Sequence, residues 1–171
     1  MVSRVLAIDP GNIDSAYCIL DRDTQRPLAH EKINNVELER KLKDGEIQFD
    51  EAAIEIVSSY GLVAGRDLFN TCIEIGRLSV IIESLGVKVF GCYRRDVKLH
   101  LTGVGASKDA NVRAALIEMY AKHDFRNGKG TKANPDWWYK FRADEWAAAG
   151  LAVCFIQRGP SLELGGVMKE L

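Results

Sequence analysis

The chain has 171 residues, of which 47% are apolar and 27% are charged, and its formal net charge is -1. This length suits one domain with a substantial core, and the near-zero charge excludes a strong overall attraction to nucleic acid while leaving room for a local basic region. The sequence shows no signal-peptide pattern and no apolar run near the roughly 20 residues of a membrane span, and its scattered cysteines predict reduced core thiols in a cytoplasmic protein.

The apolar runs at 5–8 and 16–20 predict a central strand and its hairpin partner, joined by the turn at Pro10 and Gly11. Helical spacing of apolar residues predicts a helix over 67–85, which Gly86 ends. Ser107 is the expected N-cap of a later helix. The other predicted elements are strands at 27–33, 51–60 and 87–92, helices at 36–43 and 142–156, a loop at 125–135 and an irregular tail from about 159.

This order of elements predicts an α/β fold, in which a five-stranded mixed sheet is flanked by helices. In such sheets, ligands gather beyond the ends of the parallel strands. Asp9 ends the first strand, Glu55 lies in the fourth, and Asp144 lies near the start of the last helix. If the two strands are neighbours, these carboxylates converge and need a cation such as Mg²⁺. Two such ions, roughly 3.5–4 Å apart, support phosphodiester hydrolysis.

Several segments in order resemble the RuvC-type Holliday junction resolvases of the ribonuclease H-like superfamily, especially the phage-encoded branch. They are LAIDPG (6–11), AAIEIVSSYG (52–61), DLFNTCIEIGRL (67–78), RRDVKLHLTGVGASKDANVRAALIEMY (94–120) and ADEWAAAGLAV (143–153). The resemblance implies a ribonuclease H-like nuclease domain over residues 1–171. It also implies an endonuclease that resolves four-way DNA junctions by symmetric paired nicks and leaves 5′-phosphates. Mg²⁺, with Mn²⁺ as a substitute and two ions in all, would be the cofactor of a homodimer in the cytoplasm of a bacterium or a phage-infected host.

Carried over by position, the resemblance assigns catalytic and metal-binding roles to Asp9, Glu55 and Asp144, and places the basic residues Lys98 and Lys108 near the scissile phosphate. The family usually has Asp or His three residues before the last catalytic Asp, where this chain has Phe141. Glu145 is a poor substitute, because adjacent helical residues point about 100° apart. Asp136 on the preceding loop is the other candidate to complete the metal site.

The tract 88–132 holds ten Lys and Arg residues against four Asp and Glu, which predicts a local surface that binds the DNA backbone. Phe69 either wedges into the junction or packs in the core. The cluster at 137–139 (WWY) fits a core or interface better than DNA stacking. We expect the helix at 67–85 to form the dimer surface. The predicted DNA-binding residues are Phe69, Arg94, Arg95, Lys98, Lys108 and Arg113.

Simpler interpretations of these residues remain open. Asp9 could cap a turn, Glu55 could pair with a core arginine, and Asp144 could be a helix N-cap. Lys98 and Lys108 could be ordinary solvated lysines. Two other functions also fit the sequence: a nuclease of the same fold that acts on flaps, forks or other branched phage DNA, and a junction-binding protein without activity.

Overall fold

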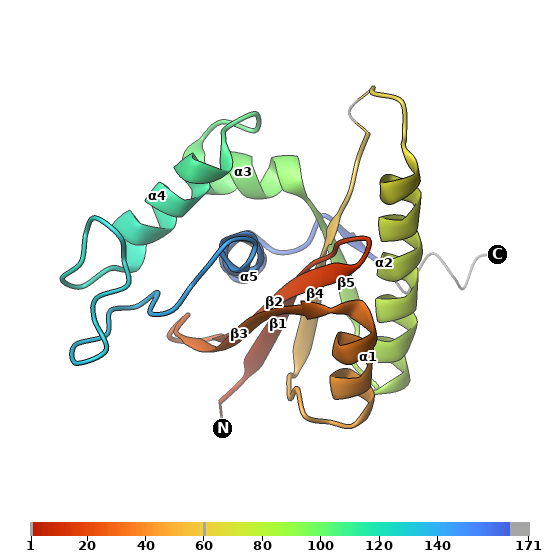
Figure 1. Ribbon diagram of the computed structural model, residues 1–171, viewed down its shortest axis with the longest axis horizontal. Coiled ribbons are helices and arrows are strands. Elements are labelled where there is room, and N and C mark those ends of the chain that lie inside the picture. The colour runs from red at the N-terminus through yellow and green to blue at the C-terminus, as the bar shows by residue number, and fades with distance from the viewer. Residues whose placement is uncertain (1, 60, 165–171) are drawn as a thin grey trace.

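The computed structural model describes residues 2–59 and 61–164, which form one sheet with helices on both faces (Figure 1). The sheet order is β3-β2-β1-β4-β5-β6, and β1 pairs in parallel with β4, as β4 does with β5. The other neighbours are antiparallel. The strands are β1 (Arg4–Asp9), β2 (Asp14–Asp21), β3 (Pro27–Asn34), β4 (Glu51–Ile56), β5 (Val89–Tyr93) and β6 (Leu162–Glu163). The helices are α1 (Asn35–Lys43), α2 (Arg66–Ser84), α3 (Arg94–Thr102), α4 (Asp109–Tyr120) and α5 (Glu145–Arg158).

Two apolar layers hold the sheet between the helices. One face packs against α1 and α2, and the other packs against α5, over which α3 and α4 lie. The middle of α5 is buried and consists largely of small residues, so α3 and α4 approach it closely. A Cβ added at Gly150 would meet side-chain atoms of Leu101 and Val112 at 3.2 Å each. The α5 helix is therefore packed against the sheet on one side and against α3 and α4 on the other. This packing also fixes the position of its N-terminus.

The predicted α/β class and the first five strands are confirmed, with three corrections. A sixth strand, β6, pairs with β5 inside the tail that was expected to be irregular; residues 165–171 of that tail lie outside the described residues. Residues 94–102 form α3, which the sequence did not predict as a helix. Lys108, rather than Ser107, is the N-cap residue of α4, because the Ser107 hydroxyl accepts a hydrogen bond from the Thr102 hydroxyl instead.

The predicted strand at 51–60 ends at Ile56, and Tyr60 lies outside the described residues. Of the four cysteines expected in the core, three are buried, but Cys72 is exposed on the outer side of α2. All four are free thiols. Within the described part of the chain, none of the helices combines the length and the apolar character that crossing a membrane requires.

Candidate active site

Asp9 is the last residue of β1, and the turn behind it is fixed by a short polar network. The Gly11 amide donates to the Ser15 hydroxyl, which donates to Asn35 Oδ1 at 2.7 Å, and Asn35 Nδ2 donates back to the Gly11 carbonyl. A Cβ at Gly11 would meet the carbonyl oxygen of Asp14 at 2.2 Å, so only glycine fits there. The Pro-Gly turn thus closes tightly and leaves the Asp9 carboxylate at the strand end.

Glu55 lies beside Asp9 because the parallel strands β1 and β4 are paired. Ile8 is opposite Ile54, so the next residue on each strand points to the other face, which α5 covers. Glu55 is 5% exposed and accepts a hydrogen bond at 2.9 Å from Arg94, the first residue of α3. The expected convergence of the two carboxylates follows from this register. The pairing with an arginine, which the sequence left open, is also present.

Asp144 precedes α5 and lies at the same end of the sheet. Ala143 turns the chain there with a φ of +40°, a conformation that L-residues seldom adopt. The Asp144 carboxylate makes no hydrogen bond that caps the helix. Instead it accepts a hydrogen bond at 2.5 Å from Lys32 on β3. Asp144 is the N-cap residue of α5, so the N-cap interpretation holds for its position, but its side chain makes no capping hydrogen bond and its charge raises the pKa of Asp9.

The electrostatics show that these carboxylates belong to one cluster. Burial, together with the negative charges of Glu55, Asp144 and Asp109 and against the lowering effect of Arg94, raises the pKa of Asp9 to about 8. Burial also raises the pKa of Glu55, which Arg94 partly opposes. Among the described residues, no hydrogen bond or ion pair reaches the Asp9 carboxylate. A positive charge placed beside Asp9 would relieve this unfavourable state.

The donor chemistry of Asp9, Glu55 and Asp144 fits a hard divalent cation, since all three offer carboxylate oxygens and Asp9 lacks a cationic partner. As they stand, though, no three His, Cys, Asp or Glu side chains in the described ranges are close enough to hold an ion. In this arrangement Arg94 pairs with Glu55 and Lys32 pairs with Asp144. The three carboxylates are the residues that would hold Mg²⁺, once these two side chains yield.

The predicted basic residues fall into two groups. Arg94 and Lys98 lie inside the site, and both contact Asp109 at the start of α4, at 2.9 and 3.0 Å. They line a hollow of about 60 Å³ together with Glu55 and Asp144. The other predicted basic DNA-binding residues do not line this hollow: Arg95 and Lys108 are exposed, and Arg113 is half-buried on α4.

Phe69 is 61% exposed near the start of α2, so the core-packing alternative for it is wrong. Asn12, in the turn after Asp9, donates a hydrogen bond to Asp67 at 3.0 Å. This contact ties the N-terminus of α2 to the strand end that carries Asp9. Phe69 therefore projects from the same end of the molecule as the acidic cluster.

The two suggested substitutes for the missing acidic residue are not in the cluster. The Asp136 carboxylate accepts backbone hydrogen bonds from residues 122, 123, 124 and 137, which hold its pKa well below its usual range. Glu145 points to β3, where its carboxylate lies 2.9 Å from His30 Nδ1. Phe141 is fully buried, and its ring stacks on His30 at 3.9 Å. Glu145 and Phe141 therefore pack against His30 on β3, and Asp136 holds the backbone of its own loop.

The aromatic cluster at 137–139 is structural in the main. Trp138 is fully buried and donates from Nε1 to the carbonyl of Leu116 at 3.0 Å. Trp137 stacks on Tyr120, with Arg26 and Lys122 over its ring. The core interpretation, which the sequence favoured, holds for Trp138.

Sequence reasoning missed Lys32 and Asp109, whose places in the site depend on strand register and on the approach of α4.

A sheet of order β3-β2-β1-β4-β5-β6, with parallel pairs at its centre and helices on both faces, has the arrangement of a ribonuclease H-like fold. Two solved structures of RuvC from Thermus thermophilus share it: one is titled as RuvC alone and the other as RuvC in complex with Holliday junction substrate. Each has a TM-score of 0.69 and 14% sequence identity, and they cover 94% and 95% of this chain and 99% of their own. No protein-family model matches the chain. The search of curated proteins also finds no match.

Proposed function

We propose that this protein is a metal-dependent endonuclease that resolves four-way DNA junctions by paired nicks. The observation that carries the proposal is the acidic cluster of Asp9, Glu55 and Asp144, placed at the strand ends of a fold shared with RuvC. The junction-bound RuvC structure, which matches 95% of this chain, supports branched DNA as the substrate class.

The proposed roles follow from the contacts. Asp9, Glu55 and Asp144 would hold Mg²⁺ or Mn²⁺, and two bound ions would supply an activated water and neutralise the charge on the leaving oxygen. Asp9 would lose its proton as the cation binds, because its pKa of about 8 keeps the carboxyl protonated at neutral pH. Lys98 and Arg94 place positive charge beside the hollow, where a scissile phosphate would lie. Lys108, which is exposed, would contact the DNA backbone.

A four-way junction has two equivalent strands to cut, so a two-fold dimer with two sites suits paired nicks. The outer stripe of α2 supports a dimer surface there, because Phe69, Ile73 and Val80 lie four and seven residues apart and are 61%, 60% and 54% exposed. We place the enzyme in the cytoplasm of a bacterium or a phage-infected host, where its DNA substrate arises. The four free thiols fit that reducing compartment.

The test is to incubate a labelled four-way junction and a matched linear duplex with the protein, with and without magnesium. We expect magnesium-dependent nicks at symmetric positions of the junction only. Asp9→Asn should abolish cleavage and leave junction binding intact, since binding depends mainly on Lys and Arg contacts to phosphates.

The assay also separates the other functions. Cleavage of flaps or forks in preference to junctions would indicate a nuclease of the same fold with a different branched substrate. Tight junction binding without cleavage in any divalent metal would indicate a junction-binding protein, in which Arg94 and Lys32 keep the carboxylates neutralised. Full cleavage by Asp9→Asn would remove the acidic cluster from the mechanism.

A further inference from the structure

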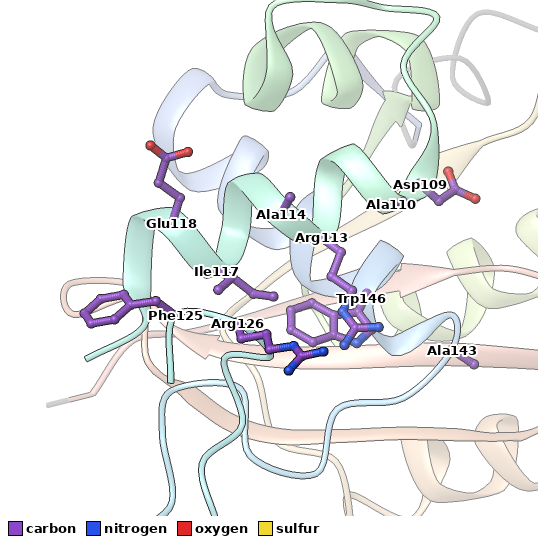
Figure 2. A pocket seen from close by; sticks show the side chains of 10 residues that line it. All are labelled: Asp109, Ala110, Arg113, Ala114, Ile117, Glu118, Phe125, Arg126, Ala143 and Trp146. Carbon is purple, nitrogen blue, oxygen red and sulfur yellow. The ribbon is translucent and has the colours of Figure 1, made fainter. Parts of the chain in front are cut away.

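An open hollow of about 940 Å³ lies between α4, the loop after it and the start of α5 (Figure 2). Its lining includes Arg113 on α4, Arg126 and Phe125 on the loop, and Trp146 on α5. We call it the arginine hollow. Ala143 and Asp109 line it too, and both also line the smaller hollow at the acidic cluster. The two hollows are therefore neighbours.

Two positive groups converge in the arginine hollow. Figure 2 shows the Arg113 and Arg126 side chains both pointing into the hollow, and the Arg113 guanidinium lies over the Trp146 indole, 5.0 Å from the ring centroid. Like charges that gather in this way favour an anion between them. A planar guanidinium is also well matched to a phosphate, which it binds with two parallel hydrogen bonds.

The charges of these two arginines are not neutralised by the protein. Among the described residues, neither forms an ion pair, in contrast to Arg94 and Lys98 beside them, which carboxylates neutralise. The two acidic residues that line the hollow, Asp109 and Glu118, point away from the guanidinium groups (Figure 2), and Asp109 is bound by Arg94 and Lys98. Both guanidinium groups are therefore free to bind an anion supplied by a ligand.

The rest of the hollow suits a nucleotide. Phe125 lies at the end away from Ala143 and is 68% exposed, so its ring can stack on a base. At the other end, Ala143 is adjacent to Asp144 of the acidic cluster. A DNA strand that leaves the acidic cluster along this path would meet the two arginines first and Phe125 next.

We propose that the arginine hollow binds one nucleotide of the DNA strand that passes the acidic cluster, with its phosphate held by Arg113 and Arg126 and its base stacked on Phe125. This inference rests on the proposed function and adds the site that sets the position of the strand relative to the carboxylates. Arg126 and Phe125 become DNA-binding residues that the sequence did not single out.

The experiment measures binding of a fluorescent four-way junction in EDTA, over a series of salt concentrations. Arg126→Gln should weaken binding roughly 10-fold and reduce the salt slope by about one. Phe125→Ala should weaken binding roughly fivefold at every salt concentration, because stacking is uncharged. Lys140→Gln is the control, since Lys140 is exposed on the segment before α5, carries the same charge, lies outside the tract 88–132 and does not line the hollow.

A set of junctions, each with one phosphate neutralised as a methylphosphonate, identifies the contact. One position should weaken binding of the wild type and have no effect on Arg126→Gln. Arg113→Gln should behave like Arg126→Gln, and thermal melts check its fold because Arg113 also packs on Trp146.

The possible outcomes separate the two proposals. If the wild type cleaves junctions while Arg126→Gln binds like Lys140→Gln, the proposal for the arginine hollow is wrong and the proposed function stands. If the wild type binds junctions without cleaving them and still depends on Arg126, the hollow stands and the enzymatic proposal is wrong. A wild type that binds no DNA would overturn both.

Discussion

Lys32 Nζ donates a hydrogen bond to Asp144 Oδ2 at 2.5 Å, across 112 residues of sequence. The sheet register explains the contact: Asp9 on β1 is opposite Ala16 on β2, which is opposite Lys32 on β3. Lys32 is therefore in line with Asp9, and its amine adds positive charge to a site that also holds Arg94 and Lys98. The same contact raises the pKa of Lys32, mainly through its hydrogen bond to Asp144.

Lys32→Met should increase the affinity of the DNA-free protein for Mn²⁺, because it frees Asp144 and removes a competing cation. Two unit charges 4 Å apart in water interact by about 1 kcal/mol, so the expected gain is on the order of fivefold. Isothermal titration calorimetry measures it. Lys41→Met is the control, because it removes the same charge from a different ion pair. The Lys41 amine, on α1, lies 2.8 Å from the carboxylate of Glu31, which precedes Lys32 on β3. Equal affinities in both variants would mean that Lys32 does not compete with the metal.

The metal-free protein should lose stability as the pH rises, because of Asp9. Its carboxyl ionises near 3.8 when unfolded but near 8 when folded, so folding becomes less favourable between those two values. Asp9→Asn removes this loss and should therefore melt above the wild type in EDTA at about pH 8, with the gap closing toward about pH 4. Thermal melts across that range measure the gap, and a gap that is independent of pH would contradict the raised pKa. Saturating Mg²⁺ should stabilise the wild type more than Asp9→Asn.

Phe141→Asp tests whether this position belongs to the metal site or to the core. Phe141 is fully buried and lies between His30 and Trp138, with ring centroids 3.9 and 5.0 Å away. Removing its ring and burying a carboxyl there should lower the free energy of unfolding by about 3 kcal/mol or more. Denaturant unfolding measures the loss, with Phe141→Leu as the milder control. We expect no gain in magnesium affinity, and a lower half-saturating magnesium concentration would return position 141 to the metal site.

Much of the fold could be predicted because the deciding signals are local. Residues 5–8 form an apolar run that ends at Asp9, and Pro10 and Gly11 turn the chain, so the first hairpin follows from the sequence. The α3 helix was missed because it is short and buries only Val97 and Leu101, which leaves little apolar periodicity. The β6 strand has two residues and depends on its neighbour β5.

The candidate site shows the same division between local and long-range signals. Asp9 and Glu55 could be proposed because each carboxylate interrupts or ends an apolar strand. Lys32 could not, since its place depends on the pairing of three strands. Asp136 was a reasonable candidate by position, but its carboxylate is fully engaged by backbone amides, which no sequence spacing indicates.

Ile73→Asp should convert a dimer to a monomer if the outer stripe of α2 is the subunit interface. A charge at the centre of an apolar interface must be desolvated without a partner, which opposes association. Analytical ultracentrifugation of the free protein measures the mass. Leu99→Asp is the control, because Leu99 is 52% exposed on α3, which lies on the other side of the sheet from α2. A monomeric wild type, or a dimeric Ile73→Asp, would place the interface elsewhere or remove it.

Phe69→Ala tests whether the exposed ring at the start of α2 opens the junction. Phe69 shares the stripe with Ile73 and Val80, so a role in the dimer must be separated from a role on DNA. If the ring inserts between bases, its loss should reduce junction cleavage roughly 10-fold, since stacking on an aromatic ring contributes about 1–3 kcal/mol per base. It should also reduce the fluorescence rise of 2-aminopurine placed at the junction centre, while the mass in solution stays that of a dimer. Phe69→Trp should restore both signals because the larger ring still stacks. If Phe69→Ala became monomeric and Phe69→Trp did not recover base unstacking, the ring would belong to the subunit interface and not to the DNA contact.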